Sequence, residues 1–68
     1  MKYAIVIEKS KKNYSCYAPD LPGCVATGGT IKEVEKNMKG AIRLHLEGMK
    51  EDGMAVPRAT SVCEYIEA

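Results

Sequence analysis

The sequence lacks the features that identify several large classes of protein. Its longest uninterrupted apolar run, Ala4 to Ile7, is far too short to span a bilayer. Met1-Lys2 does not lead into the apolar segment of a secretory signal. The formal net charge is only +1, with both signs interleaved, so no basic face of the kind that binds nucleic acid is indicated. We therefore expect a cytoplasmic protein that does not enter a membrane.

The cysteine pattern argues against two further kinds of site. The three cysteines, Cys16, Cys24 and Cys63, leave one thiol over under any pairing within the chain. None lies in the Cys-x-x-Cys spacing that indicates a redox pair or a zinc knuckle. All three fall in strand-like segments, where a free cysteine packs as a small hydrophobic residue. We expect structural thiols in a reduced, cytosolic protein.

Candidate catalytic residues are equally few. His45 is the one histidine, and helical periodicity places it near the middle of an apolar stripe, which predicts a structural role with its ring hydrogen-bonded to backbone or to a partner. Asp20, between two prolines, is predicted to bond the backbone of its own turn. The remaining carboxylates outside the helix do not form the converging set that a two-metal nuclease needs. No catalytic residue, metal or cofactor is predicted, and we do not expect an enzyme.

The extended segments predict a small sheet within a single domain, residues 1–68. Chains of this size usually need disulfides, a metal or oligomerisation to support a small core. Strands rich in β-branched and aromatic residues are predicted at 2–9, 14–18, 24–27 and 60–66. Pro22-Gly23 predicts a type II turn in which Gly23 takes a positive φ. The first strand is apolar on both faces, which predicts either a central position or a face in contact with a partner.

One long helix is predicted between Thr30 and Gly53. Thr30 and Glu33 form a capping box, and Gly53 suits the left-handed residue that ends a helix. The residues that share one apolar stripe at 100° per residue are Ile31, Val34, Met38, Ala41, Ile42, His45 and Met49. The predicted fold is α+β in the order β-β-β-α-β: a three-stranded antiparallel meander, a helix packed on it, and a C-terminal strand that returns to the sheet.

Leu44 and Leu46 widen the apolar face of the helix on its two flanks. One interpretation is ordinary contact with the loop at 54–57. The other is contact of this half of the helix with another subunit. Gly40 and Gly48 each cost about 1 kcal/mol inside a helix, which is consistent with a close backbone approach there.

The order of these residues resembles one family. The run Tyr-Ser-Cys-Tyr-Ala-Pro-Asp-Leu-Pro-Gly-Cys-Val-Ala-Thr-Gly at 14–28 resembles the strand-turn-strand of HicB-like antitoxins, and Leu44-His45-Leu46 with the Asp52-Gly53 end resembles their helix. The resemblance covers nearly the whole chain. It implies a partial ribonuclease-H-like fold without catalytic carboxylates, and a protein that masks a small HicA-type toxin that cleaves messenger RNA. Many relatives carry a C-terminal DNA-binding domain. This sequence ends at Ala68 without one, so direct DNA binding is not expected.

The main hypothesis is therefore a self-associating antitoxin, a dimer or tetramer, whose partner is a HicA-like toxin ribonuclease. The residues predicted to contact the toxin or a second copy are Leu44, Leu46, Met49, Asp20, Leu21 and Pro22, the last three as an exposed turn. One alternative is an RNA-binding or residual ribonuclease module, with His45 and Asp20 active and the lysines of the 9–12 turn on phosphate. Another is an orphan homo-oligomeric structural domain.

Overall fold

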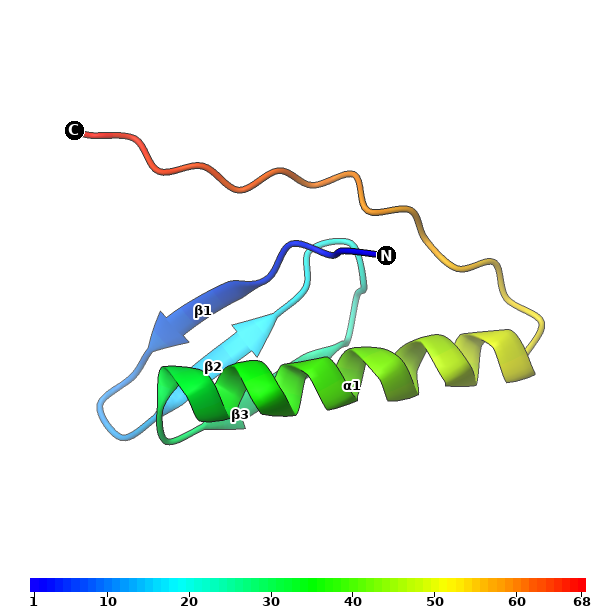
Figure 1. The fold of residues 1–68 in the computed structure, drawn as a ribbon, viewed down its shortest axis with the longest axis horizontal. Coiled ribbons are helices and arrows are strands. Elements are labelled where there is room, and N and C mark those ends of the chain that lie inside the picture. The colour runs from blue at the N-terminus through cyan, green and yellow to red at the C-terminus, as the bar shows by residue number, and fades with distance from the viewer.

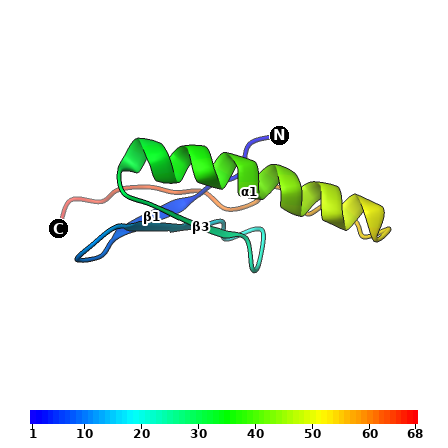
Figure 2. The same ribbon diagram turned by 90° about the horizontal axis from the view of Figure 1, so that it is seen from below.

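The computed structural model describes residues 1–68 and measures 40 × 27 × 16 Å. Its elements, in order, are β1 (Val6–Lys9), β2 (Tyr14–Tyr17), β3 (Val25–Gly28) and α1 (Ile31–Glu51). The strands form an antiparallel sheet in the order β1-β2-β3, and α1 lies across one face of it and leaves the other face uncovered (Figures 1 and 2). The predicted meander with one long helix is confirmed.

Two turns connect the strands as their residues dictate. In the β1–β2 turn the Ser10 backbone N–H donates to the Asn13 carbonyl at 2.8 Å. In the β2–β3 connection the Cys24 N–H donates to the Leu21 carbonyl at 3.0 Å, and Gly23 has φ 83°. That hydrogen bond and the positive φ are those of a type II turn with proline second and glycine third. The predicted turn at Pro22-Gly23 is confirmed.

The start of α1 is capped as predicted. The Glu33 backbone N–H donates to Thr30 Oγ1 at 3.1 Å. The Glu33 carboxylate reaches back to accept from the backbone N–H of Gly29 at 3.0 Å, one residue before the one that a standard capping box satisfies. Gly28 packs even closer, because a Cβ built on it would lie 2.6 Å from the Val34 backbone nitrogen. A glycine at the end of β3 therefore lets the helix begin directly against the sheet.

The core lies between α1 and the sheet. It consists of the six buried apolar residues Cys16, Ala18, Leu21, Cys24, Val34 and Met38. Only 7 of 68 residues are buried. In the predicted apolar stripe of the helix, only Val34 and Met38 are fully buried, and most of the other side chains are half-buried. A core this small gives the isolated chain little apolar burial to offset the entropy of folding.

The predicted fourth strand is not present. Residues 54–68 form no helix or strand, and they run past β1 without joining the sheet (Figure 1). Asp20 holds this segment at Thr60 and Ser61. The chain beyond Ser61 makes no backbone hydrogen bond to β1. β1 is likewise shorter than predicted and begins at Val6.

Candidate protein-binding surface

A groove of about 500 Å³ lies along the C-terminal half of α1. Its walls come from the helix, from the β2–β3 turn and from the segment that follows the helix. The residues that line it are Pro22, Leu44, His45, Gly48, Met49, Asp52, Met54 and Pro57. An apolar depression with a few polar groups at its edge is the usual form of a recognition site on a small domain.

The end of α1 builds one wall of this groove. Gly53 has φ 71°, its N–H donates to the Lys50 carbonyl at 3.1 Å, and the Met54 N–H donates to the Met49 carbonyl at 2.8 Å. This pair of bonds is a Schellman motif, which stops the helix and turns the chain back on itself. The predicted end of the helix at Gly53 is confirmed, and the reversal carries the following residues alongside the helix.

Two long-range contacts hold the returning segment in place. The Tyr3 hydroxyl donates to the Pro57 carbonyl at 2.6 Å. Asp20 Oδ2 accepts from the backbone N–H groups of Thr60 and Ser61, each at 3.0 Å, and Oδ1 accepts from their hydroxyls at 3.2 and 2.7 Å. These donors hold the pKa of the Asp20 carboxyl below its usual range, with the Ser61 backbone contact as the largest cause. Asp20 is thus a clamp on the chain after the helix.

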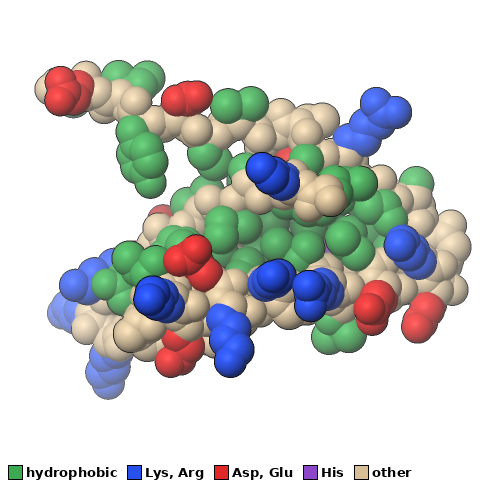
Figure 3. Space-filling view, viewed as in Figure 1, with side chains coloured by type: hydrophobic (Ala, Val, Ile, Leu, Met, Phe, Trp, Pro, Cys, Tyr) green, Lys and Arg blue, Asp and Glu red, His purple; other side chains and the backbone are tan.

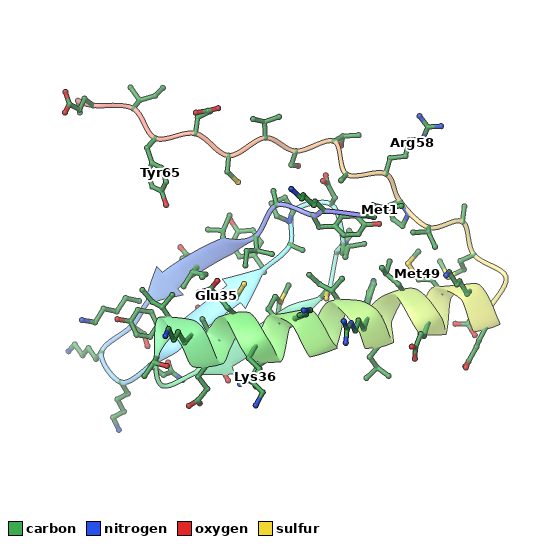
Figure 4. All side chains as sticks on the ribbon, viewed as in Figure 1. Met1, Glu35, Lys36, Met49, Arg58 and Tyr65 are labelled. Carbon is green, nitrogen blue, oxygen red and sulfur yellow. The ribbon has the colours of Figure 1, made fainter.

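The groove brings together three of the predicted contact residues. Leu44 is 72% exposed, Pro22 is exposed, and Met49 is half-buried. Met49 points from the helix toward the returning segment (Figure 4). A leucine left this open beside an apolar depression is the arrangement expected of a surface that gains by being covered.

Leu46 lies elsewhere. It is half-buried, packs against the core, and lines a different depression with Tyr3 and Ile42. The two leucines that flank the helix stripe therefore face different surroundings. Leu46 is largely used by the fold, while Leu44 is available.

The β2–β3 turn differs from the prediction in two ways. Leu21 was expected to be exposed with its neighbours, but it is 0% exposed and belongs to the core. Two successive turns, closed by the Leu21 N–H to the Ala18 carbonyl and by the Cys24 N–H to the Leu21 carbonyl, place its side chain against α1. Asp20 was expected to bond its own turn, but its oxygens are taken by Thr60 and Ser61. Pro22 alone of the three presents its side chain at the groove.

His45 is not a core residue, although helical periodicity places it near the middle of the apolar stripe. It is half-buried, lies outside the core cluster and lines the groove beside Leu44. The reason is the length of the helix. Its 21 residues span about 32 Å, against about 13 Å for a four-residue strand, so the second half of α1 extends beyond the sheet.

The glycines of α1 have no close neighbour within the chain. A Cβ built on Gly40 or Gly48 meets nothing within 4 Å, so the close approach suggested by their positions is not made within this chain. Gly48 is nevertheless a groove residue, where the missing side chain flattens the wall.

The uncovered face of the sheet carries a second apolar feature that sequence reasoning missed. Tyr17 pairs with Val6 on one side and Val25 on the other, so the three form a row across the strands. Tyr17 is 42% and Val25 is 64% exposed. Strand alternation indicates only that the side chain of Tyr17 lies on the sheet face opposite to that of its neighbour Cys16, which is buried.

The residues that a ribonuclease would need do not converge. The lysine-bearing β1–β2 turn lies at the opposite end of the molecule from the C-terminal half of α1, which carries His45 (Figures 1 and 2). No group of three or more His, Cys, Asp or Glu side chains in residues 1–68 is arranged to hold a metal ion. The single helix, α1, does not contain the length of apolar sequence that a bilayer span requires.

Two of the cysteines are built into the core. Cys16 and Cys24 are 2% and 4% exposed, and Cys63 is exposed. Burial raises the pKa of the Cys16 thiol, with smaller contributions from Cys24 and Glu35, and burial also raises the pKa of the Cys24 thiol. A raised pKa keeps a thiol protonated and unreactive. All three cysteines are free.

Comparison with known proteins identifies the family. The sequence model of the HicB_like antitoxin of bacterial toxin–antitoxin systems matches residues 3–68. A 14.9 kDa protein from the rep–hol intergenic region of Haemophilus phage HP1 is 42% identical over 97% of this chain and 50% of its own length. A UPF0150 protein of Thermoplasma acidophilum is 41% identical over 85% of this chain and 86% of its own. The chain belongs to the HicB-like antitoxin family.

A solved structure agrees with this assignment. A chain of the HicA3 and HicB3 toxin–antitoxin complex has a TM-score of 0.72 and 33% identity to this chain, over 81% of this chain and 64% of that one. The chain thus spans half of the phage relative and under two thirds of this structural neighbour.

Proposed function

We propose that this chain is an antitoxin, one non-catalytic domain over residues 1–68, that binds a small HicA-like toxin and neutralises it by covering its messenger-RNA-cleaving surface. The observation that carries the proposal is the apolar groove along the second half of α1, with exposed Leu44 at its edge, on a chain of the antitoxin family. The likeness to a chain of a toxin–antitoxin complex supports a toxin as the occupant.

The groove has the chemistry of a protein interface. Complete burial of a leucine side chain stabilises a complex by roughly 1.5–3 kcal/mol, and Leu44 has most of its surface left to bury. His45 and Asp52 supply polar groups at the edge, as in the polar rim of an interface. Gly48 leaves room for a partner side chain against the helix.

The test is co-expression of the chain with a HicA-like toxin encoded beside it, with growth and co-purification as readouts. We expect the wild-type chain to restore growth and to co-purify with the toxin. Leu44→Gln should weaken the complex at least about tenfold. Ile31→Gln is the matched control, because Ile31 is 50% exposed on the same helix but lies outside the groove.

Two results would count against the proposal. Failure of the wild-type chain both to bind the toxin and to restore growth would remove the antitoxin role. If Leu44→Gln and Ile31→Gln lose the same amount of binding, the antitoxin role would stand, but the toxin would have to bind at a surface other than the groove.

A further inference from the structure

The chain after Ser61, which we call the tail (residues 62–68), has the sequence of a strand and no strand partner. Val62, Tyr65 and Ile66 are 80%, 103% and 90% exposed. None of the backbone groups of the tail makes a hydrogen bond within the chain. The side chain of Tyr65 points from the tail toward β1 and touches nothing there, and the tail stands apart from the body of the molecule (Figures 3 and 4).

The outer edge of β1 is equally unpaired. β1 bonds β2 on one side only, because the sheet order places it at the edge. A groove of about 400 Å³ separates it from the tail, lined by the strand residues Ile5, Val6 and Ile7 and by the tail residues Val62, Cys63, Glu64 and Tyr65. Two unpaired backbone edges thus face each other across an apolar groove. An open edge of this kind is a template for another strand.

We propose that the tail of a second copy of this chain fills the groove. The second copy's tail then lies between β1 and the tail of the first copy. In return, the first copy's tail lies between β1 and the tail of the second copy. The two sheets then join in the order β3-β2-β1-tail-tail-β1-β2-β3, with a two-fold axis between the two tails. In each copy the tail forms one wall of the groove and also fills the groove of the other copy. The same contact is therefore made twice, which closes the dimer as an isologous interface requires.

Strand direction favours a second copy over the chain's own tail. β1 and the tail run the same way along the molecule (Figure 1), so closure of the groove by the chain's own tail would make a parallel pair. A two-fold axis turns the second tail antiparallel to both β1 and the first tail. Antiparallel pairing is the more stable per residue and the commoner of the two.

Charge favours the same arrangement. Lys2 precedes β1 in the chain, and Glu67 lies near the far end of the tail. An antiparallel second tail brings its Glu67 toward Lys2. The chain's own tail, being parallel, would bring Glu67 toward Glu8 instead, where like charges repel. The second copy also covers the exposed apolar residues of the tail, which the small core of one chain cannot do.

The test measures the oligomeric state of the purified full chain without any toxin, by sedimentation velocity over a wide range of concentration. We expect a dimer. Glu64→Pro removes a tail N–H that makes no hydrogen bond in the single chain, so the fold of each chain should be kept. The same change removes a backbone donor from the strand pairing of the proposed dimer. The dimer dissociation constant should rise at least about tenfold. Val62→Ser should weaken the dimer too, whereas Val25→Ser, an exposed valine at the other edge of the sheet, should not.

A native thiol reports the topology. Cys63 is the exposed cysteine, while Cys16 and Cys24 are buried, so a short bismaleimide should join two chains through their tails, and Cys63→Ser should abolish the product. A monomer at all concentrations overturns the proposal, whether or not the β1 amides are protected from hydrogen exchange. So does a dimer that Glu64→Pro leaves unchanged. Because no toxin is present, failure of the antitoxin role leaves this result untouched.

Discussion

Asp20 and Ser61, 41 residues apart, are joined by two hydrogen bonds: the Ser61 N–H donates to Asp20 Oδ2 at 3.0 Å and the Ser61 hydroxyl donates to Oδ1 at 2.7 Å. Thr60 repeats the pattern on the same carboxylate. The β2–β3 turn thereby determines where the segment after the helix begins its path past β1. Both the groove along α1 and the groove beside β1 depend on that path.

Asp20→Ala should release this segment without unfolding the domain. The carboxylate bonds only Thr60 and Ser61, while Leu21 next to it supplies the core packing. We expect the amides of residues 60 and 61 to lose their protection in hydrogen exchange, with those of α1 unchanged. Pro22→Ala, in the same turn but without a bond to the segment, is the control. Unchanged protection in Asp20→Ala would mean that the clamp is not formed in solution.

Acid should release the same segment. The folded pKa of Asp20 is lowered, so its contribution is fully present above the ordinary aspartate pKa of about 3.9 and is lost as pH falls through the lower folded value. We expect protection of the 60–61 amides to be constant from about pH 7 to about pH 5 and to fall below about pH 4. NMR titration of the Asp20 carboxyl checks the sign, because a midpoint above the ordinary value would contradict the clamp.

Much of this fold could be predicted because its signals are local. Thr30, Gly23 and Gly53 each act within a few residues of their own position, through a cap, a type II turn and a Schellman motif. The fate of Asp20 and of the fourth strand depends on residues forty or more positions away, and nothing local reports that. The burial of Leu21 depends on its packing against the helix residues Val34 and Met38, and strand alternation does not encode that contact.

The candidate surface was predicted in part for the same reason. Leu44 was correctly placed on the flank of the helix, since helical angle is a local property. His45 was misplaced because the angle says which way a side chain points, but not whether the sheet extends far enough to cover it. The row of Val6, Tyr17 and Val25 needs the register of three strands, which pattern alone does not give.

Gly28→Ala should destabilise the domain, and Gly29→Ala should not. A Cβ on Gly28 would lie 2.6 Å from the Val34 nitrogen and 2.9 Å from its Cα, both backbone atoms that cannot rotate away. Forcing helix and strand apart costs about 1–3 kcal/mol in the free energy of unfolding. A Cβ on Gly29 comes no nearer than 3.9 Å to the Glu33 carboxylate, so we expect a change within about 0.5 kcal/mol. Urea denaturation of the two variants decides it.

Gly40→Ala and Gly48→Ala should both stabilise the free protein, yet differ in toxin binding. Neither Cβ meets an atom within 4 Å, and alanine in a helix is favoured by about 0.5–1 kcal/mol over glycine. Gly48 lines the groove and Gly40 does not. We therefore expect only Gly48→Ala to weaken the proposed toxin complex, as measured by calorimetric titration. Equal affinities would place the partner away from Gly48.

The thiols of Cys16 and Cys24 should react only when the domain opens. Both are buried, and burial raises the pKa of each, so neither the thiolate nor a path for the reagent is available in the folded chain. In Cys63→Ser, which keeps these two alone, we expect labelling by Ellman's reagent to follow the unfolding rate and to accelerate with urea. A labelling phase in native buffer that is faster than the measured rate of unfolding would show instead that the sheet and helix separate locally around Cys16 or Cys24.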